Sequence, residues 1–176
     1  MAAANSLDLQ SDPRSIIGIR EFDAPRELVF SVWTDAKHLA QWWGPNGFTT
    51  TTSRFEFRPG GVWRFVMHRP DGRDYQNRIT FDEVMPPERI VYHHGGDDVE
   101  PVQFKTTVIF EDIGGRTRMT WRGDFPSADE RNRVIREYQA DQGLVQTMTR
   151  LGDYVSSMNG RDRSDQSQAA RREQRA

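Results

Sequence analysis

The feature that most constrains the fold is a single long helix pattern that follows an almost unbroken series of short strand patterns. Six segments between residues 48 and 123 have strand-like composition or alternation, and Gly or Pro pairs separate most of them, at 59–61, 70–72, 86–87, 95–96 and 114–115. Connections this short predict consecutive antiparallel strands. One more strand pattern, at 15–22, precedes them. The chain therefore predicts a single antiparallel sheet of seven strands.

The helices of the chain divide into two short ones and a long one. Pro25 at a first helical position and Thr34 or Asp35 as an N-cap predict two short helices after the first strand. Ser127, with Glu130 three residues later, is a capping box for a helix over about 128–157. Its apolar face is formed by Val134, Tyr138, Val145, Met148, Leu151 and Val155. An apolar sheet face must be covered, so we expect the sheet to curve around this long helix and to enclose an apolar cavity.

Size and charge narrow the class of protein. The chain has 176 residues, 24 Lys and Arg against 26 Asp and Glu, and no Cys. This length favours one folded domain, over 13–158, between a disordered N-terminal tail at 1–12 and a disordered basic C-terminal tail at 159–176. The near balance of charge is not typical of a nucleic-acid-binding protein. With no signal peptide and no apolar run of about 20 residues, we expect a cytoplasmic protein without membrane insertion.

The sequence offers little for metal or cofactor chemistry. Without Cys there are no disulfides, thiolate nucleophiles or Cys-based zinc sites. His93 and His94 are adjacent on a predicted strand, so their side chains point to opposite faces. We find no zinc-binding or phosphate-binding motif, and the Gly-rich segments are predicted to be turns. The prediction is therefore no metal and no cofactor.

Strand parity identifies the candidate ligand-binding residues. Tyr75 and Asn77 share a predicted face with apolar neighbours, as does His94, and a few polar groups in an apolar chamber can orient a ligand. The alternative is that each lies at a strand end and bonds to the backbone. Gly143 costs the long helix ~1 kcal/mol relative to Ala, so it either keeps the cavity open or allows close approach to the sheet. The full set is Trp43, Trp63, Phe65, Met67, Tyr75, Asn77, Ile79, Tyr92, His94, Phe104, Trp121, Gly143 and Met148.

The order and spacing of several short motifs also resemble a known family. The motifs are Ala24-Pro25 with Val29-Phe30 and Trp33-Thr34, Trp42-Trp43-Gly44-Pro45, Arg58-Pro59-Gly60-Gly61, the run from Pro86 to Tyr92, and Gly143 ahead of Leu151 and Tyr154-Val155. Over about residues 15–157 the chain resembles the activator-of-heat-shock-protein-ATPase-like (AHSA-type) family of the START and birch-pollen-allergen-like SRPBCC superfamily. The resemblance implies a helix-grip fold with a hydrophobic cavity. It does not imply one function.

Three functions remain open from the sequence. The first is binding of a small hydrophobic ligand, aromatic or lipidic, in the cavity of a monomer or homodimer. The second is a cyclase-like or hydrolase-like enzyme acting in the same cavity, with Tyr75, His94 or His68 as acid–base groups. The third is a co-chaperone-type interaction module with a role in the stress response. A chaperone partner has weak support, because the additional N-terminal domain of the family's namesake has no counterpart in the roughly 14 residues before the first strand.

Overall fold

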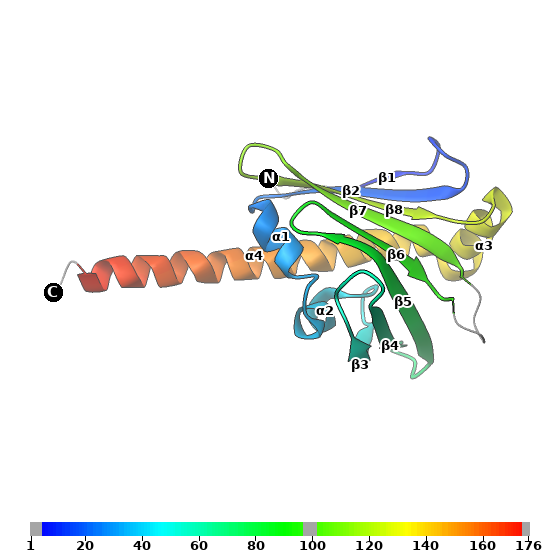
Figure 1. Cartoon of the computed structure of the whole chain (residues 1–176), viewed down its shortest axis with the longest axis horizontal. Helices are drawn as coiled ribbons and strands as arrows, with labels where there is room; N and C mark the ends of the chain where they lie inside the picture. Colours follow the sequence, from blue (N-terminus) through cyan, green and yellow to red (C-terminus); the bar gives the residue numbers. More distant parts are fainter. Residues whose placement is uncertain (1–4, 97–101, 174–176) are drawn as a thin grey trace.

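The computed structural model describes residues 5–96 and 102–173 and confirms an α+β helix-grip architecture (Figure 1). One antiparallel sheet runs in the order β1-β2-β8-β7-β6-β5-β4-β3, so β3 to β8 form a meander and β2 closes against β8. The strands are β1 (Asn5–Asp8), β2 (Ser15–Phe22), β3 (Thr49–Phe55), β4 (Val62–His68), β5 (Asp74–Met85), β6 (Arg89–His94), β7 (Phe104–Asp112) and β8 (Thr117–Asp124).

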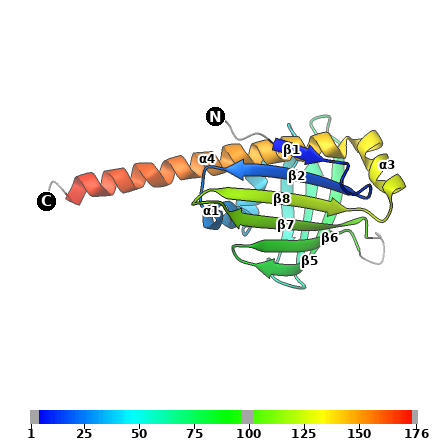
Figure 2. The ribbon, with the colours of Figure 1, turned by 90° about the horizontal axis from the view of Figure 1, so that it is seen from above.

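Four helices accompany this sheet. They are α1 (Arg26–Ser31), α2 (Ala36–Trp42), α3 (Ala128–Tyr138) and α4 (Ala140–Glu173). The Asp35 side chain caps α2 by accepting a hydrogen bond from the Lys37 N–H, and Ser127 caps α3 in the same way through the Glu130 N–H. α4 packs along β1 and β2 on one side and α2 on the other (Figure 1), and β1 and β2 lie beside it in the view from above (Figure 2). Its Met148, Leu151 and Val155 belong to the same core as the buried residues of the sheet, as the helix-grip prediction requires.

Within the described residues the sheet has eight strands and not the predicted seven, because the N-terminal segment adds a strand. Residues 5–8 pair with β2 as strand β1, whereas the sequence predicts a disordered tail over 1–12; residues 1–4 lie outside the described part. Polar contacts hold this segment. The Asn5 side chain donates to the Val145 carbonyl at 3.2 Å and to Thr149 Oγ1 at 2.7 Å, and Arg131 Nη1 donates to the Leu9 carbonyl at 2.9 Å. Such contacts leave no hydrophobic pattern in the sequence, which explains the wrong prediction.

The long C-terminal helix differs from prediction at its break and at its end. Gln139 has a left-handed backbone, with φ 52°, and divides the predicted helix 128–157 into α3 and α4. α4 then continues to Glu173, which makes it about 51 Å long. The residues beyond Asn159 extend away from the sheet (Figures 1 and 2) instead of forming the predicted disordered tail. Arg, Gln, Ala and Glu favour helix there once the preceding turns have formed; residues 174–176 lie outside the described part.

Five indole rings fill the centre of the grip. We call this set the tryptophan cluster: Trp33, Trp42, Trp43, Trp63 and Trp121. Their centroids lie 4.8–6.2 Å apart in mostly edge-to-face pairs. This is the favoured geometry for aromatic pairs. All five side chains are buried, and the Trp42 indole N–H donates to the Val32 carbonyl at 3.1 Å.

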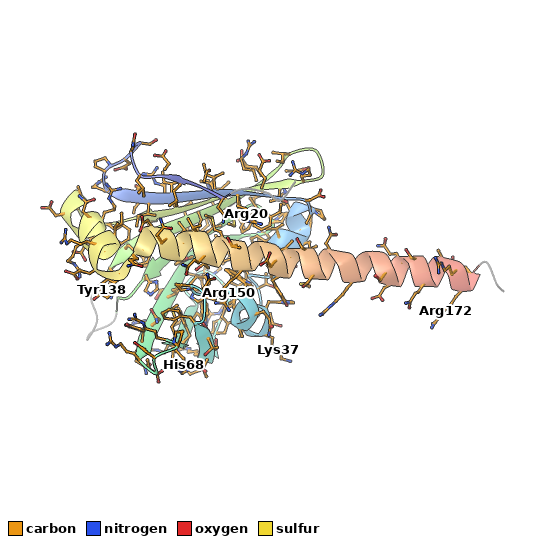
Figure 3. The ribbon with its side chains drawn as sticks, turned by 180° about the vertical axis from the view of Figure 1, so that it is seen from behind. Arg20, Lys37, His68, Tyr138, Arg150 and Arg172 are labelled. Carbon is orange, nitrogen blue, oxygen red and sulfur yellow. The ribbon has the colours of Figure 1, made fainter. Side chains whose placement is uncertain are left out.

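The loop between α2 and β3 is fastened to α4 by one cation. Arg150 Nη1 lies within 2.8–3.4 Å of four carbonyl oxygens, those of Trp43, Gly44, Pro45 and Phe48. In Figure 3, Arg150 projects from α4 on the side away from Arg20. Burial lowers the pKa of Arg150. Gln146 adds a further tie by accepting the Asn46 N–H at 3.0 Å. The loop therefore holds a fixed position beside the first turns of α4.

Candidate functional site

A row of neighbouring aromatic rings runs from the core towards the end of the sheet nearest α3. We define the aromatic row as Phe65, His94, Phe104 and Phe125. The His94 ring stacks on Phe104 with centroids 4.9 Å apart and an interplanar angle of 27°, and Phe104 lies 4.9 Å from Phe125. Phe65 lies 6.3 Å from His94 and stacks on Trp63 at 3.9 Å, so the row joins the tryptophan cluster. His94 and Phe104 are partly exposed.

One polar pair lies within this row. His94 Nε2 is 2.8 Å from Asn77 Oδ1, across the paired strands β5 and β6. The Asn77 amide nitrogen donates to the Tyr75 carbonyl at 2.9 Å. The sequence predicts that Asn77 and His94 share the concave face, and the structure brings the two side chains into contact.

The ring environment of His94 determines its charge. Burial lowers the pKa of the imidazole from 6.5 to about 4, because the charged form loses hydration among apolar rings. His94 is therefore neutral at pH 7. The site combines flat apolar surfaces with one uncharged imidazole, a combination suited to holding an aromatic molecule rather than an ion.

The predicted ligand residues fall into two groups. Seven of them belong to the buried core: Trp43, Trp63, Phe65, Ile79, Tyr92, Trp121 and Met148. The other six are partly exposed: Met67, Tyr75, Asn77, His94, Phe104 and Gly143. Of these, Asn77, His94 and Phe104 meet in or beside the aromatic row. The centre of the grip is occupied by side chains, so a ligand contacting this conformation would lie against the partly exposed group. The internal cavity stays a prediction.

Tyr75 and Gly143 lie apart from the His94–Asn77 pair. The Tyr75 hydroxyl is 3.4 Å from Arg69 Nη1, and hydrogen bonding to Arg69 and Arg73 lowers the pKa of this phenol. A Cβ added at Gly143 would lie 3.4 Å from Pro45 Cγ, and no other described heavy atom outside α4 would come within 4 Å of it. Gly143 therefore faces the loop between α2 and β3 and not the sheet, which neither of the two sequence interpretations of this residue anticipated.

The proposed acid–base residues do not converge on one site. His68 projects from the opposite face of the sheet to Met67, with Nδ1 2.7 Å from Asp74 Oδ1 and Nε2 2.8 Å from Thr51 Oγ1. The side chains of His68 and Asp74 are 35% and 56% exposed, so this network is hydrated. His68 in Figure 3 lies at the far edge of the sheet from Arg20. His93 also points outward and pairs with Asp82 at 2.6 Å, as adjacency to His94 predicts.

Two residues near the site were not predicted from the sequence. Phe125 follows β8 directly and completes the aromatic row. Strand parity does not extend to a residue beyond the strand, so the sequence did not predict that this side chain points inward; its apolar character was the one indication. Arg150 lies between Met148 and Leu151 on α4, and a lone cation beside the apolar face was the only indication of its role. Within residues 5–96 and 102–173 no group of three metal-binding side chains occurs, and no helix is long and apolar enough to span a membrane.

Solved structures share this architecture. A protein of Arthrobacter aurescens superposes with a TM-score of 0.78 at 26% identity, covering 86% of this chain and 91% of its own. A protein of Nitrosomonas europaea gives 0.75 at 21% identity, with 84% and 97% covered. The AHSA1 protein of Silicibacter pomeroyi gives 0.67 at 23% identity, with 82% and 99% covered. A search of curated proteins finds no match.

The fold and the aromatic interior define a helix-grip protein. Residues 23–156 match the family described as Activator of Hsp90 ATPase homolog 1-like protein. This match covers most of the chain, and the chain belongs to this AHSA-type family of the SRPBCC superfamily, as the sequence motifs indicate. Membership suggests a ligand-binding or co-chaperone-like module.

Proposed function

We propose that this protein binds a small, uncharged aromatic molecule against the aromatic row. The observation that carries the proposal is the stack of His94 on Phe104 at 4.9 Å, both partly exposed, with Asn77 holding the imidazole. Exposed ring edges next to a buried aromatic cluster offer a ligand the offset-stacked and edge-to-face contacts that aromatic pairs prefer. A neutral imidazole adds a polar contact without the desolvation cost of a buried charge.

The other two functions have less support in the structure. An enzyme would need its acid–base groups to meet around one substrate, whereas His68, His94 and Tyr75 each bond to a different partner. A co-chaperone surface is favoured by a contiguous exposed apolar patch. Among the large apolar side chains exposed in the described residues, Met85 and Ile109 lie on either side of the charged Arg89 across β5, β6 and β7, and Val102 and Tyr138 lie on other segments. Small-molecule binding is therefore the function that the geometry supports best.

The test is a titration with toluene as a minimal aromatic probe, followed by chemical-shift changes in NMR spectra. We expect saturable shifts of Phe104, Phe125 and His94 signals. The variant Phe104→Ala should weaken toluene binding about 5-fold or more through loss of a stacking partner. The matched control is Phe57→Ala, which removes another partly buried ring, stacked on Phe55 at 6.0 Å. Equal loss in both variants, or no saturable binding to the unmodified protein, would refute the proposal.

A further inference from the structure

The orientation of the Asn77 amide is fixed by the backbone. Its Nδ2 donates to the Tyr75 carbonyl at 2.9 Å, and a carbonyl oxygen can only accept. The amide oxygen must therefore be the atom that faces His94. Rotating the amide by 180° would place two oxygens together at Tyr75 and lose that hydrogen bond.

The amide in turn fixes the imidazole tautomer. Asn77 Oδ1 lies 2.8 Å from His94 Nε2 and is an acceptor, so Nε2 carries the hydrogen. In a neutral ring the other nitrogen, Nδ1, then has a free lone pair. Burial keeps this ring neutral at pH 7. No described residue donates a hydrogen bond to Nδ1.

The rings that contact His94 are apolar, so a ligand in the row meets the Nδ1 lone pair as its hydrogen-bond acceptor. Phe104 stacks on the imidazole and Phe65 meets it edge to face, and neither side chain can form a conventional hydrogen bond. A ligand that stacks here finds an acceptor on His94, whereas one of the two Asn77 amide hydrogens is already bonded to the Tyr75 carbonyl. A ligand donor would satisfy Nδ1, while an anionic or acceptor group would face the lone pair unfavourably.

We propose that the aromatic row selects ligands that carry a hydrogen-bond donor on the ring, with phenols as the chemical class, through acceptance by His94 Nδ1. This inference rests on the proposed function and assigns its ligand chemistry. Asn77 acts as a positioning residue, because it touches His94 and sets which nitrogen is free.

The test compares three probes of similar shape: p-cresol, which donates, 4-methylanisole, which only accepts, and toluene, which does neither. We expect p-cresol to bind roughly 3- to 10-fold more tightly than 4-methylanisole, the range of one net hydrogen bond. His94→Phe keeps a ring in the row and should abolish this preference while retaining toluene binding. His93→Phe is the matched control, since His93 points to the opposite face, and it should leave the preference unchanged.

Imidazole ¹⁵N spectra supply a readout independent of affinity. Free protein should show His94 with a protonated Nε2 and an unprotonated Nδ1, and p-cresol should shift the Nδ1 signal while 4-methylanisole does not. Asn77→Leu removes the acceptor, so it should weaken the tautomer preference and reduce the selectivity for p-cresol.

The outcomes separate the two proposals. Equal binding of the three probes, with dependence on Phe104, would overturn phenol selection and leave aromatic binding in place. A protonated Nδ1 in the free protein would also overturn it. No saturable binding of any probe would overturn both.

Discussion

The tryptophan cluster and the aromatic row are built from the same kind of side chain but differ in what surrounds their rings. Trp42 and Trp63 are 0% and 1% exposed, and other side chains meet them on all sides. His94 and Phe104 keep part of their surface open, and the ring contacts of the described residues join them to the cluster through Phe65. Burial converts ring area into stability, whereas open ring area is available for a ligand. The comparison therefore predicts that stability and binding depend on different aromatic residues.

Removal of a cluster ring should have the largest effect. Trp42→Ala should cost about 3–5 kcal/mol of unfolding free energy, because it leaves a cavity and removes the bond to the Val32 carbonyl. Phe104→Ala should cost roughly 1–2 kcal/mol, since part of that ring is already exposed. Urea denaturation of both variants measures the difference. If Trp42→Ala cannot be purified folded, Trp42→Phe supplies a milder test. Equal losses of unfolding free energy in Trp42→Ala and Phe104→Ala would show that the cluster does not contribute more stability than the row.

Arg150 acts on the cluster side of this comparison, because the loop that it holds begins at Trp43. Arg150→Met retains much of the side-chain length but leaves four carbonyl oxygens without their shared donor. We expect a loss of about 2 kcal/mol, in the range for hydrogen bonds to a charged group. Arg172→Met, on the exposed end of the same helix (Figure 3), is the control and should change stability by less than about 0.5 kcal/mol. A similar loss in both variants would remove the special role of Arg150.

His94 should make the aromatic row sensitive to acid. Its pKa is about 4 in the folded protein, against 6.5 for an unperturbed imidazole. Between these values the unfolded chain binds a proton that the folded protein does not, so His94 lowers stability as the pH falls from 6.5 to 4. The slope is at most about 1.4 kcal/mol per pH unit. Above the unperturbed pKa the contribution is constant.

Paired denaturation curves at about pH 7 and about pH 4.5 measure this effect. His94→Phe should lose less stability on acidification than the unmodified protein, by roughly 2 kcal/mol. His93→Phe is the matched control, because His93 lies on the opposite face beside Asp82 and outside the row. Identical acid sensitivity of the His94→Phe variant and the unmodified protein would show that burial does not depress the pKa of this imidazole.

Most of the fold could be predicted from periodic apolar patterns in the sequence. β2 has the predicted bounds, 15–22, and the shared face of Asn77 and His94 followed from parity alone. The break at Gln139 could not be predicted, because a left-handed residue is normally signalled by Gly or Asn. The places of Asn5 and Arg150 depend on hydrogen bonds across more than 100 residues of sequence. Such bonds have no periodic signature, and Gly143 likewise revealed its neighbour Pro45 only in three dimensions.

The projecting part of α4 belongs to neither aromatic region, and its removal should have the smallest effect. The Asn159 side chain donates to the Asp23 carbonyl at 2.9 Å, and Met158 packs on the core. Truncation after Asn159 keeps both contacts and should change the melting temperature by less than about 2 °C, because the removed side chains that the structure describes are exposed. Truncation after Val155 removes both contacts and should lower the melting temperature by several degrees, at about 2–4 °C per kcal/mol for a domain of this size. Toluene should bind equally well to the protein truncated after Asn159 and to the intact protein. A drop of about 10 °C on truncation after Asn159 would mean that the projecting residues pack on the domain, and a change in toluene affinity would place them at the aromatic row.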